Sequence, residues 1–154
     1  MKSQIAIEVA APPARLFLLA REVARWPDLL PHYRRVTVRR QTGDRVLADM
    51  VAVRRFGPLP VPVTWRAEQW SDGSDEADMR LEFRHVRGVT RGMAVTWHIR
   101  PMADGARVVI EHDFSRRLPL LGDRPLPWFV DRFFVRPIAG RTLATFKALA
   151  ERAA

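Results

Sequence analysis

Three stretches in the second half of the chain alternate in hydropathy with a period of two residues, the pattern of strands with one buried face. That face is mostly large and apolar, but each stretch also places one polar residue on it. The residues expected to point inward are Met79, Leu81, Phe83, His85, then Arg91, Met93, Val95, Trp97, Ile99, then Val108, Ile110, His112 and Phe114. An unpaired polar group shut away from water costs about 1 to 3 kcal/mol, and a bare guanidinium costs more. The pattern therefore predicts a sheet with a hollow behind it that holds water or a ligand.

Four further strands are expected where short alternating runs end at turn-forming residues. They cover residues 3–9, 34–40, 45–55 and 61–70. Turns are expected at 42–44, 86–88 and 103–105, so consecutive strands are antiparallel. Pro62 cannot donate a hydrogen bond to a neighbouring strand, which predicts that its strand begins near a sheet edge or a bulge.

The helical segments stand apart from the strands in their apolar spacing. Pro12 and Pro13 open a helix with apolar residues at i, i+3, i+4 and i+7, and one short helical turn is expected within 25–31. Residues 128–153 are expected to form a long helix with one apolar stripe, which Pro137 kinks or divides. The prediction is an α+β fold in which helices pack on one face of the sheet.

Length and composition favour one folded unit, and we expect a single domain over residues 1–154. The absence of cysteine excludes disulfides, thiolate metal ligands and cysteine nucleophiles. No run of about 18 apolar residues occurs, so a cytoplasmic protein is expected. The histidines form no HxH or HExxH pattern, and there is no glycine-rich phosphate loop, so neither a metal nor a cofactor is expected.

The chain is strongly basic, with a net charge of +9, and nearly all of its basic residues are arginine. Such a charge favours anionic partners: lipid headgroups, acidic carrier proteins or nucleic acid. Many arginines fall on the outward strand positions, where a solvated outer surface explains them. These are Arg35, Arg39, Arg80, Arg84, Arg100 and Arg107. No aromatic residues are interleaved with them for base stacking, which argues against a nucleic-acid or ribosome partner.

Several short motifs, taken in order, give the chain a resemblance to a known superfamily. They are Ile5 to Val9 followed by Ala11-Pro12, Trp26-Pro27-Asp28-Leu29-Leu30-Pro31-His32-Tyr33, Gly92-Met93 with Trp97, Glu111-His112-Asp113-Phe114, and Ile138 to Leu143. With these motifs the chain resembles the START-like (SRPBCC) superfamily, which includes bacterial polyketide aromatase/cyclases and coenzyme Q-binding proteins. The resemblance implies a helix-grip fold: a curved seven-stranded antiparallel sheet wrapped around a long C-terminal helix, with two short helices after the first strand.

The same resemblance implies a pocket between sheet and helix for an apolar or aromatic molecule. We expect it to bind a lipid, a prenylated quinone or a polyketide-like molecule. The residues expected to contact this ligand are Trp26, Leu30, Trp65, Gln69, Phe83, His85, Met93, Trp97, Trp128, Asp131 and Val135. For His85, Trp65 and Trp97, ordinary packing of the pocket wall is an alternative role.

An enzyme of the aromatase/cyclase kind is the alternative function, with Tyr33, Arg91 and His112 as catalytic candidates. The resemblance implies a role for Tyr33 and for His112, while the arginine that cyclases place in the pocket is matched here by Gln69. Arg91 is expected to replace it from a neighbouring strand, paired with Asp131 or a ligand carbonyl. A basic protein that associates with ribosomes or membranes is the second alternative.

Residues 117–127 are expected to form a loop, and its segment from Leu118 onward is unusually apolar and bracketed by arginines. Such a tip could enter an anionic membrane surface, which would make the protein peripheral to the inner membrane. Alternatively the loop is a lid that buries its leucines over the pocket. Both alternatives place the loop at the pocket entrance.

Overall fold

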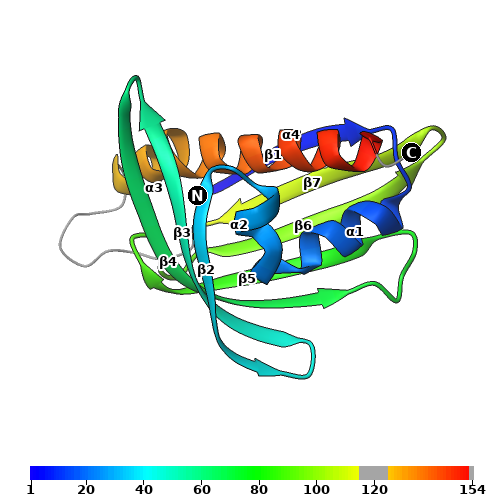
Figure 1. Cartoon of the computed structure of the whole chain (residues 1–154), viewed down its shortest axis with the longest axis horizontal. Helices are drawn as coiled ribbons and strands as arrows, with labels where there is room; N and C mark the ends of the chain where they lie inside the picture. Colours follow the sequence, from blue (N-terminus) through cyan, green and yellow to red (C-terminus); the bar gives the residue numbers. More distant parts are fainter. Residues whose placement is uncertain (115–124, 153–154) are drawn as a thin grey trace.

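Seven antiparallel strands form one curved sheet in the computed structural model, which describes residues 1–114 and 125–152 (Figure 1). Strands β2 to β7 follow one another as a meander, and β1 adds to its far edge beside β7. The strands are β1 (Lys2–Val9), β2 (Tyr33–Thr42), β3 (Arg45–Phe56), β4 (Leu59–Asp72), β5 (Met79–Gly88), β6 (Ala94–Met102) and β7 (Gly105–Asp113). The predicted helix-grip fold with seven antiparallel strands is confirmed.

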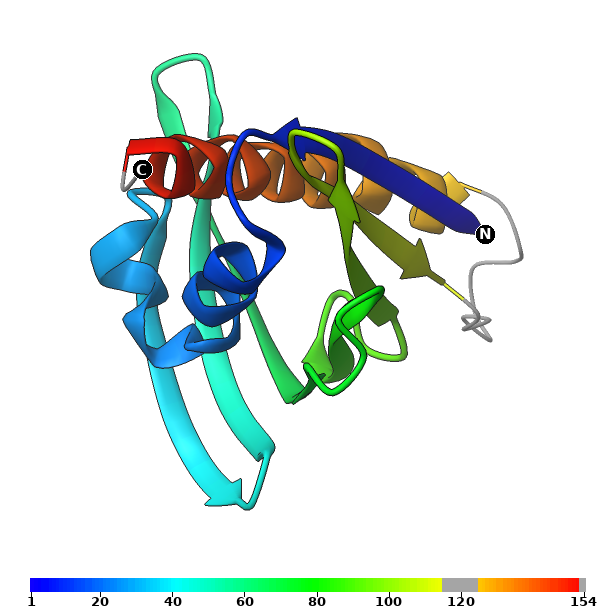
Figure 2. The same cartoon turned by 90° about the vertical axis from the view of Figure 1, so that its right-hand side faces the viewer.

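The helices lie inside the curve of this sheet, as the view in Figure 2 shows. Two short helices follow β1, as predicted, and a nearly continuous helical stretch closes the chain. The elements are α1 (Pro13–Arg21), the 3-10 turn η1 (Val23–Arg25), α2 (Trp26–Leu29), α3 (Pro125–Val130), the π-helical turn η2 (Asp131–Val135) and α4 (Arg136–Arg152). No helix in the described ranges is long and apolar enough to cross a membrane. Of the loop predicted over 117–127, residues 117–124 lie outside the described residues. The prediction is wrong for residues 125–127, which begin α3.

The predicted alternation sorts the strand residues between the two faces. In β5 the burial pattern alternates strictly from Met79 to His85, and the apolar side chains of β6 and β7 are buried in the same way. The arginines assigned to the outer face are all exposed. Some of them pair with acids there: Arg39 binds Asp49 at 2.7 Å, and Arg80 and Arg100 each bind Asp78 at 3.0 Å.

Pro62 occupies the position that its chemistry predicts. It lies in β4 opposite Val53 of β3, but β5 pairs with β4 only from Trp65 onward. The first part of β4 is therefore an edge, where a residue without an N–H leaves no neighbouring carbonyl unpaired.

The turn between β5 and β6 differs from the prediction, and this moves Arg91. The hairpin closes where His85 exchanges hydrogen bonds with Met93 and Gly92, at 2.9 and 2.8 Å, so the chain between them leaves the ladder. Arg91 lies in this longer turn and is exposed. The inward position predicted for Arg91 is wrong because the alternation of β6 does not extend past Met93.

Pro137 divides the last helix, as predicted, but the division takes the form of a π-helical turn. Proline has no N–H, so the carbonyl of Phe133, four residues earlier, receives no bond from it. Arg54 of β3 donates its Nε–H to that carbonyl at 2.9 Å. The helix widens just before the proline, where the N–H of Arg136 reaches the carbonyl of Asp131.

Candidate functional site

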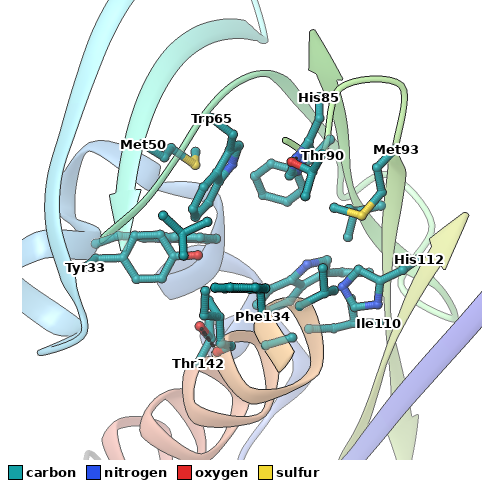
Figure 3. Close-up of a pocket in the computed structure, with 18 residues that line it drawn as sticks. Tyr33, Met50, Trp65, His85, Thr90, Met93, Ile110, His112, Phe134 and Thr142 are labelled. Carbon is teal, nitrogen blue, oxygen red and sulfur yellow. Dashed lines mark hydrogen bonds between the residues drawn. The ribbon is translucent and has the colours of Figure 1, made fainter. Parts of the chain in front are cut away.

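A cavity lies between the concave face of the sheet and the helical stretch formed by η2 and α4 (Figure 3). Its volume, counted as the space open to the centres of water molecules, is about 80 Å³. On that measure one water needs about 10 to 15 Å³, so the cavity has room for several waters or for part of an organic molecule. It is lined by Trp26, Tyr33, Met50, Val63, Trp65, Phe83, His85, Thr90, Met93, Val95, Trp97, Ile110, His112, Phe134, Val135, Ile138, Ala139 and Thr142.

Most of this wall is apolar, and aromatic rings make up its floor. Trp26 stands at the centre, with ring centroids 5.0 Å from Tyr33, 5.8 Å from Phe83 and 6.1 Å from Trp97. The Trp26 indole N–H is satisfied by the carbonyl of Ala20 at 3.1 Å, so the buried ring leaves no unpaired donor. These rings fit one another edge to face or tilted, as aromatic side chains prefer, and they give the cavity a rigid base.

One side of the wall carries the first of three hydrogen-bonding groups. His85 Nδ1 lies 2.6 Å from the Thr90 hydroxyl, and the imidazole stacks flat on the Trp65 indole with centroids 5.7 Å apart. Burial, helped by the nearby His112, lowers the pKa of His85 to about 3. At neutral pH this imidazole is therefore uncharged.

His112 lies across the cavity from Tyr33 and Trp65 and is 4% exposed (Figure 3). Its Nδ1 is buried without a hydrogen-bond partner among the described residues. Burial lowers its pKa to about 4, although the carboxylate of Asp131 opposes that shift. His112 is thus a neutral imidazole with unused hydrogen-bonding capacity, placed in an apolar wall.

Tyr33 and Thr142 form the third group, at the opposite end of the cavity from His112. Thr142 donates to the carbonyl of Ile138 at 2.9 Å, so its oxygen accepts from His32 Nε2 at 2.8 Å. Burial raises the pKa of Tyr33 far above its usual range, which keeps the phenol protonated. A protonated phenol can donate a hydrogen bond to a ligand oxygen.

No charged side chain lines this cavity in the described part of the chain. Its polar groups are two neutral imidazoles, a phenol and two threonine hydroxyls. Burying an ion here without a counter-charge would be costly, whereas an uncharged molecule with a carbonyl or hydroxyl oxygen meets both donors and acceptors. The same residue ranges contain no group of three or more His, Asp or Glu side chains positioned to hold a metal ion.

Three lining residues are only half-buried, Trp65 of β4, Phe134 of η2 and Ile138 of α4, and from this we infer that the cavity opens beside them. Figure 3 shows the rings of Trp65 and Phe134 on opposite sides of the cavity. Nearly all the other lining residues are buried. A ligand that enters by this route would pass between a strand and the π-helical turn.

Nine of the residues that the sequence proposed for the site line the cavity. They are Trp26, Tyr33, Trp65, Phe83, His85, Met93, Trp97, His112 and Val135. Five of them were predicted to point inward from the period of two residues, and they do line the cavity: Phe83, His85, Met93, Trp97 and His112.

Five proposed site residues lie elsewhere. Arg91 is in the exposed turn described above, and Trp128 is 54% exposed on α3. Leu30 and Gln69 are buried in the packed core beyond the cavity lining. Asp131 is also buried, but it accepts hydrogen bonds from Ser3 at 2.6 Å and Arg136 at 2.9 Å, so it binds β1 to the helix and does not line the cavity.

The other nine lining residues were not among the proposed ligand contacts: Met50, Val63, Thr90, Val95, Ile110, Phe134, Ile138, Ala139 and Thr142. Met50 belongs to the alternating inner face of β3, a signal that was present in the sequence. Thr90 lies in the turn that is longer than predicted, and Phe134 lies in the π-helical turn, where a regular helical period does not apply.

Comparison with known proteins decides the family. The family model described as "Polyketide cyclase / dehydrase and lipid transport" matches residues 1–154. The chain belongs to this family. No curated protein sequence matches it at a significant level.

Solved structures with the same fold include proteins of different described roles. The protein TTHA0849 from Thermus thermophilus is 23% identical, with a TM-score of 0.77 and coverage of 100% of this chain and 99% of that one. The Zhui aromatase/cyclase from Streptomyces sp. R1128 is 16% identical, with a TM-score of 0.74 and coverage of 99% and 94%. A STAR-related lipid transfer protein from Xanthomonas axonopodis is 14% identical, with a TM-score of 0.67 and coverage of 97% and 85%. At these identities the likeness establishes the START-like fold of this family member.

Proposed function

We propose that this family member binds an uncharged hydrophobic molecule that carries at least one carbonyl or hydroxyl oxygen. The observation that supports this proposal is a cavity lined by apolar and aromatic side chains, two neutral imidazoles and a phenol, with no charged side chain among the described lining residues. A lipid, a prenylated quinone and a polyketide-like molecule all fall in this class. His85, His112 and Tyr33 are the groups that orient the ligand oxygens.

A fluorescence titration tests this function. N-phenyl-1-naphthylamine is a neutral dye that brightens in apolar sites, so its binding reports the cavity. We expect 1-dodecanol to displace the dye and dodecanoate, which has the same chain length but a negative charge, to displace it at least tenfold less well. Equal displacement by the two competitors would overturn the uncharged-ligand assignment.

Replacing two alanines of α4 by leucine, one at a time, shows where the dye binds. Ala139 lines the cavity and is buried, whereas Ala144 is exposed on the same helix. Ala139→Leu fills part of the cavity, so the dye and the added side chain would compete for the same space. Because crowding extra groups into a filled space costs about 1 to 3 kcal/mol, dye binding is expected to weaken about tenfold. Ala144→Leu should leave the affinity unchanged, and an equal loss in both variants would show that the dye binds elsewhere.

A second candidate function is cyclisation or dehydration of a polyketide-like substrate, favoured by the unpartnered nitrogen of His112. A neutral imidazole can take a proton from a carbon beside a ketone, while the Tyr33 hydroxyl donates a hydrogen bond to the ketone oxygen. Arg91 has no part in this proposal because it lies in the exposed turn. The test is turnover of a soluble poly-β-ketone analogue: loss in both Tyr33→Phe and His112→Leu supports an enzyme, and dye binding without any turnover supports a binding protein.

A further inference from the structure

A second surface feature lies next to the cavity entrance and is separate from the cavity lining. Two of the most exposed aromatic residues in the described chain are neighbours on α3: Trp128 is 54% exposed and Phe129 is 46% exposed. Phe133, one turn later, contacts both, with ring centroids 6.3 and 4.7 Å away. We call Trp128, Phe129 and Phe133 the aromatic patch.

The aromatic patch is connected ring to ring with the cavity. Phe129 lies 6.1 Å from Phe134, a half-buried residue at the cavity entrance, and Phe134 lies 5.8 Å from Phe56 at the end of β3. The patch sits at the end of the helical stretch opposite the C-terminus (Figure 1). An apolar surface thus runs without a break from outside the molecule to the ligand entrance.

Arginines surround this apolar surface. Arg132 lies 5.8 Å from the Trp128 ring, and Arg54 lies 4.7 Å from the Phe56 ring. The charged residues within 54–62 and 128–141 are Arg54, Arg55, Arg132, Arg136, Arg141 and Asp131. Asp131, the acid among them, is buried and paired with Arg136, so the surface that this region presents is cationic.

We propose that the aromatic patch and its arginines dock on an anionic lipid bilayer. Tryptophan and phenylalanine settle at the depth of the lipid headgroups, and arginines near them are attracted to negative lipids. The bilayer is favoured over an acidic protein because the patch combines exposed apolar rings with basic charge beside an entrance for an apolar ligand. The biological role of this docking rests on the proposed function: with the entrance held at the bilayer, the ligand passes between bilayer and cavity without crossing water.

Vesicle binding tests the docking surface directly. We expect sedimentation with vesicles of equimolar phosphatidylcholine and phosphatidylglycerol, and much weaker sedimentation with phosphatidylcholine alone. Trp128→Ala with Phe129→Ala should weaken binding by about tenfold or more, the equivalent of losing one large buried apolar side chain. Arg132→Gln should weaken it about fivefold.

Leu18→Ala provides the matched control, because Leu18 is an apolar residue of α1 that is 58% exposed. It should bind vesicles as the unaltered chain does. The patch variants are checked by their circular dichroism and by dye binding in the absence of vesicles, which report the fold and the cavity. A patch variant that binds the dye normally but no longer binds vesicles has a defect in docking alone. If the unaltered chain does not bind the dye at all, that result counts against the proposed function, while vesicle sedimentation still decides the docking proposal.

Brominated lipid gives an independent signal from Trp128. The other four tryptophans, Trp26, Trp65, Trp70 and Trp97, are buried or half-buried. Brominated phosphatidylcholine in the anionic vesicles should therefore quench part of the tryptophan fluorescence of the unaltered chain. This quenching should be absent in Trp128→Phe. The proposal is overturned if the chain does not sediment with anionic vesicles, if the patch variants bind as well as Leu18→Ala, or if the patch residues are needed only for binding an acidic carrier protein.

Discussion

At the scale of single residues, the cavity depends on polar side chains whose partners are few and well defined. His85 rests on Trp65 and bonds to Thr90, while His112 Nδ1 has no partner within the described chain. In an apolar wall the hydrogen-bonded His85 lowers the stability of the fold little. The unpaired nitrogen of His112 lowers it more, because an unpaired buried polar atom loses its bonds to water. An energetic cost retained beside a cavity is consistent with a ligand that supplies the missing bond.

Thr90→Val tests the first of these contacts. The substitution keeps the shape of the side chain but leaves His85 Nδ1 without its partner, so the free energy of unfolding in urea should fall by about 1 to 3 kcal/mol. Thr64→Val, at an exposed position of β4, serves as the control and should change it by less than about 0.5 kcal/mol. In a His85→Phe background, Thr90→Val should cost much less, and an undiminished cost there would show that the hydroxyl does not act through His85.

The pH dependence of stability follows from three buried histidines, the cavity residues His85 and His112 and their neighbour His32. Burial lowers the pKa to about 3 for His85 and to about 4 for His112 and His32 in the folded chain, against 6.5 for an ordinary histidine. Between these values the unfolded chain binds more protons, so the free energy of unfolding falls as pH is lowered from about 6.5 towards 4. The slope is at most about 1.4 kcal/mol per pH unit for each histidine.

Urea unfolding at pH 7.5 and pH 5.0 measures this slope. His112→Leu removes one of the titrating groups and should flatten the dependence, with little loss of stability at pH 7.5 because the described residues offer Nδ1 no bond to lose. Carboxyl groups affect stability in a different pH range. Arg66 lowers the pKa of Asp49 below its usual range, so the stability that this ion pair contributes is lost only at pH values below about 4. An unchanged slope in His112→Leu would contradict a neutral, buried imidazole.

At the scale of elements, the cavity wall is shaped where the strands depart from a regular ladder. The register between β4 and β5 shifts beside His85, so that Val86 falls between the pairs Ala67↔His85 and Arg66↔Arg87. Gly88 follows at φ +101° and faces Trp65. This irregular segment positions His85, Thr90 and Trp65 around the cavity.

Gly88→Ala is therefore expected to harm the cavity as well as the fold. A Cβ at Gly88 would lie 2.6 Å from the Thr64 carbonyl oxygen and 2.9 Å from the Trp65 Cα, whereas one at Gly43 would meet nothing within 4 Å. Both glycines have positive φ, so each substitution should cost about 1 to 2 kcal/mol of backbone strain. Gly88→Ala should cost about 1 to 3 kcal/mol more, because the backbone cannot move aside as a side chain can.

Thermal unfolding and dye binding measured together separate these two effects. Gly43→Ala should lower the melting temperature slightly and leave dye affinity intact. Gly88→Ala should lower both, since its clash moves the Trp65 wall. Equal losses in the two variants would show that strain alone, and not the contact with β4, accounts for the effect.

The sequence predicted these elements well where the spacing of apolar residues stayed regular along the whole element, and poorly where that spacing was interrupted. Alternation from Met79 to His85 and the apolar stripe of the last helix were sufficient for β5 and α4. The same alternation, continued backwards through a turn, misplaced Arg91. Pro137 indicated a break in the helix, but the π-helical turn before it depends on Arg54 binding the Phe133 carbonyl, a contact between segments far apart in the chain.

At the scale of the whole molecule, the hollow was inferred from polar residues on an apolar face, and two of the three polar residues used for that inference line the cavity. Its extent was beyond sequence reasoning, because it depends on how side chains from β3, β4, the β5–β6 turn and η2 fill the space together. The outward arginines were also predicted, but a charge of +9 does not select a partner. A ribosome-associated role stays a prediction that vesicle binding does not address.

The methionine methyl groups provide the most direct test that this space receives a ligand. Met50 and Met93 line the cavity, whereas Met79 is buried away from it and Met102 is exposed at the end of β6. The protein is labelled with [methyl-¹³C]methionine and titrated with 1-dodecanol. If the alcohol binds in the cavity, the Met50 and Met93 resonances should shift together while those of Met79 and Met102 stay in place. Saturable binding that leaves Met50 and Met93 unmoved would contradict this prediction.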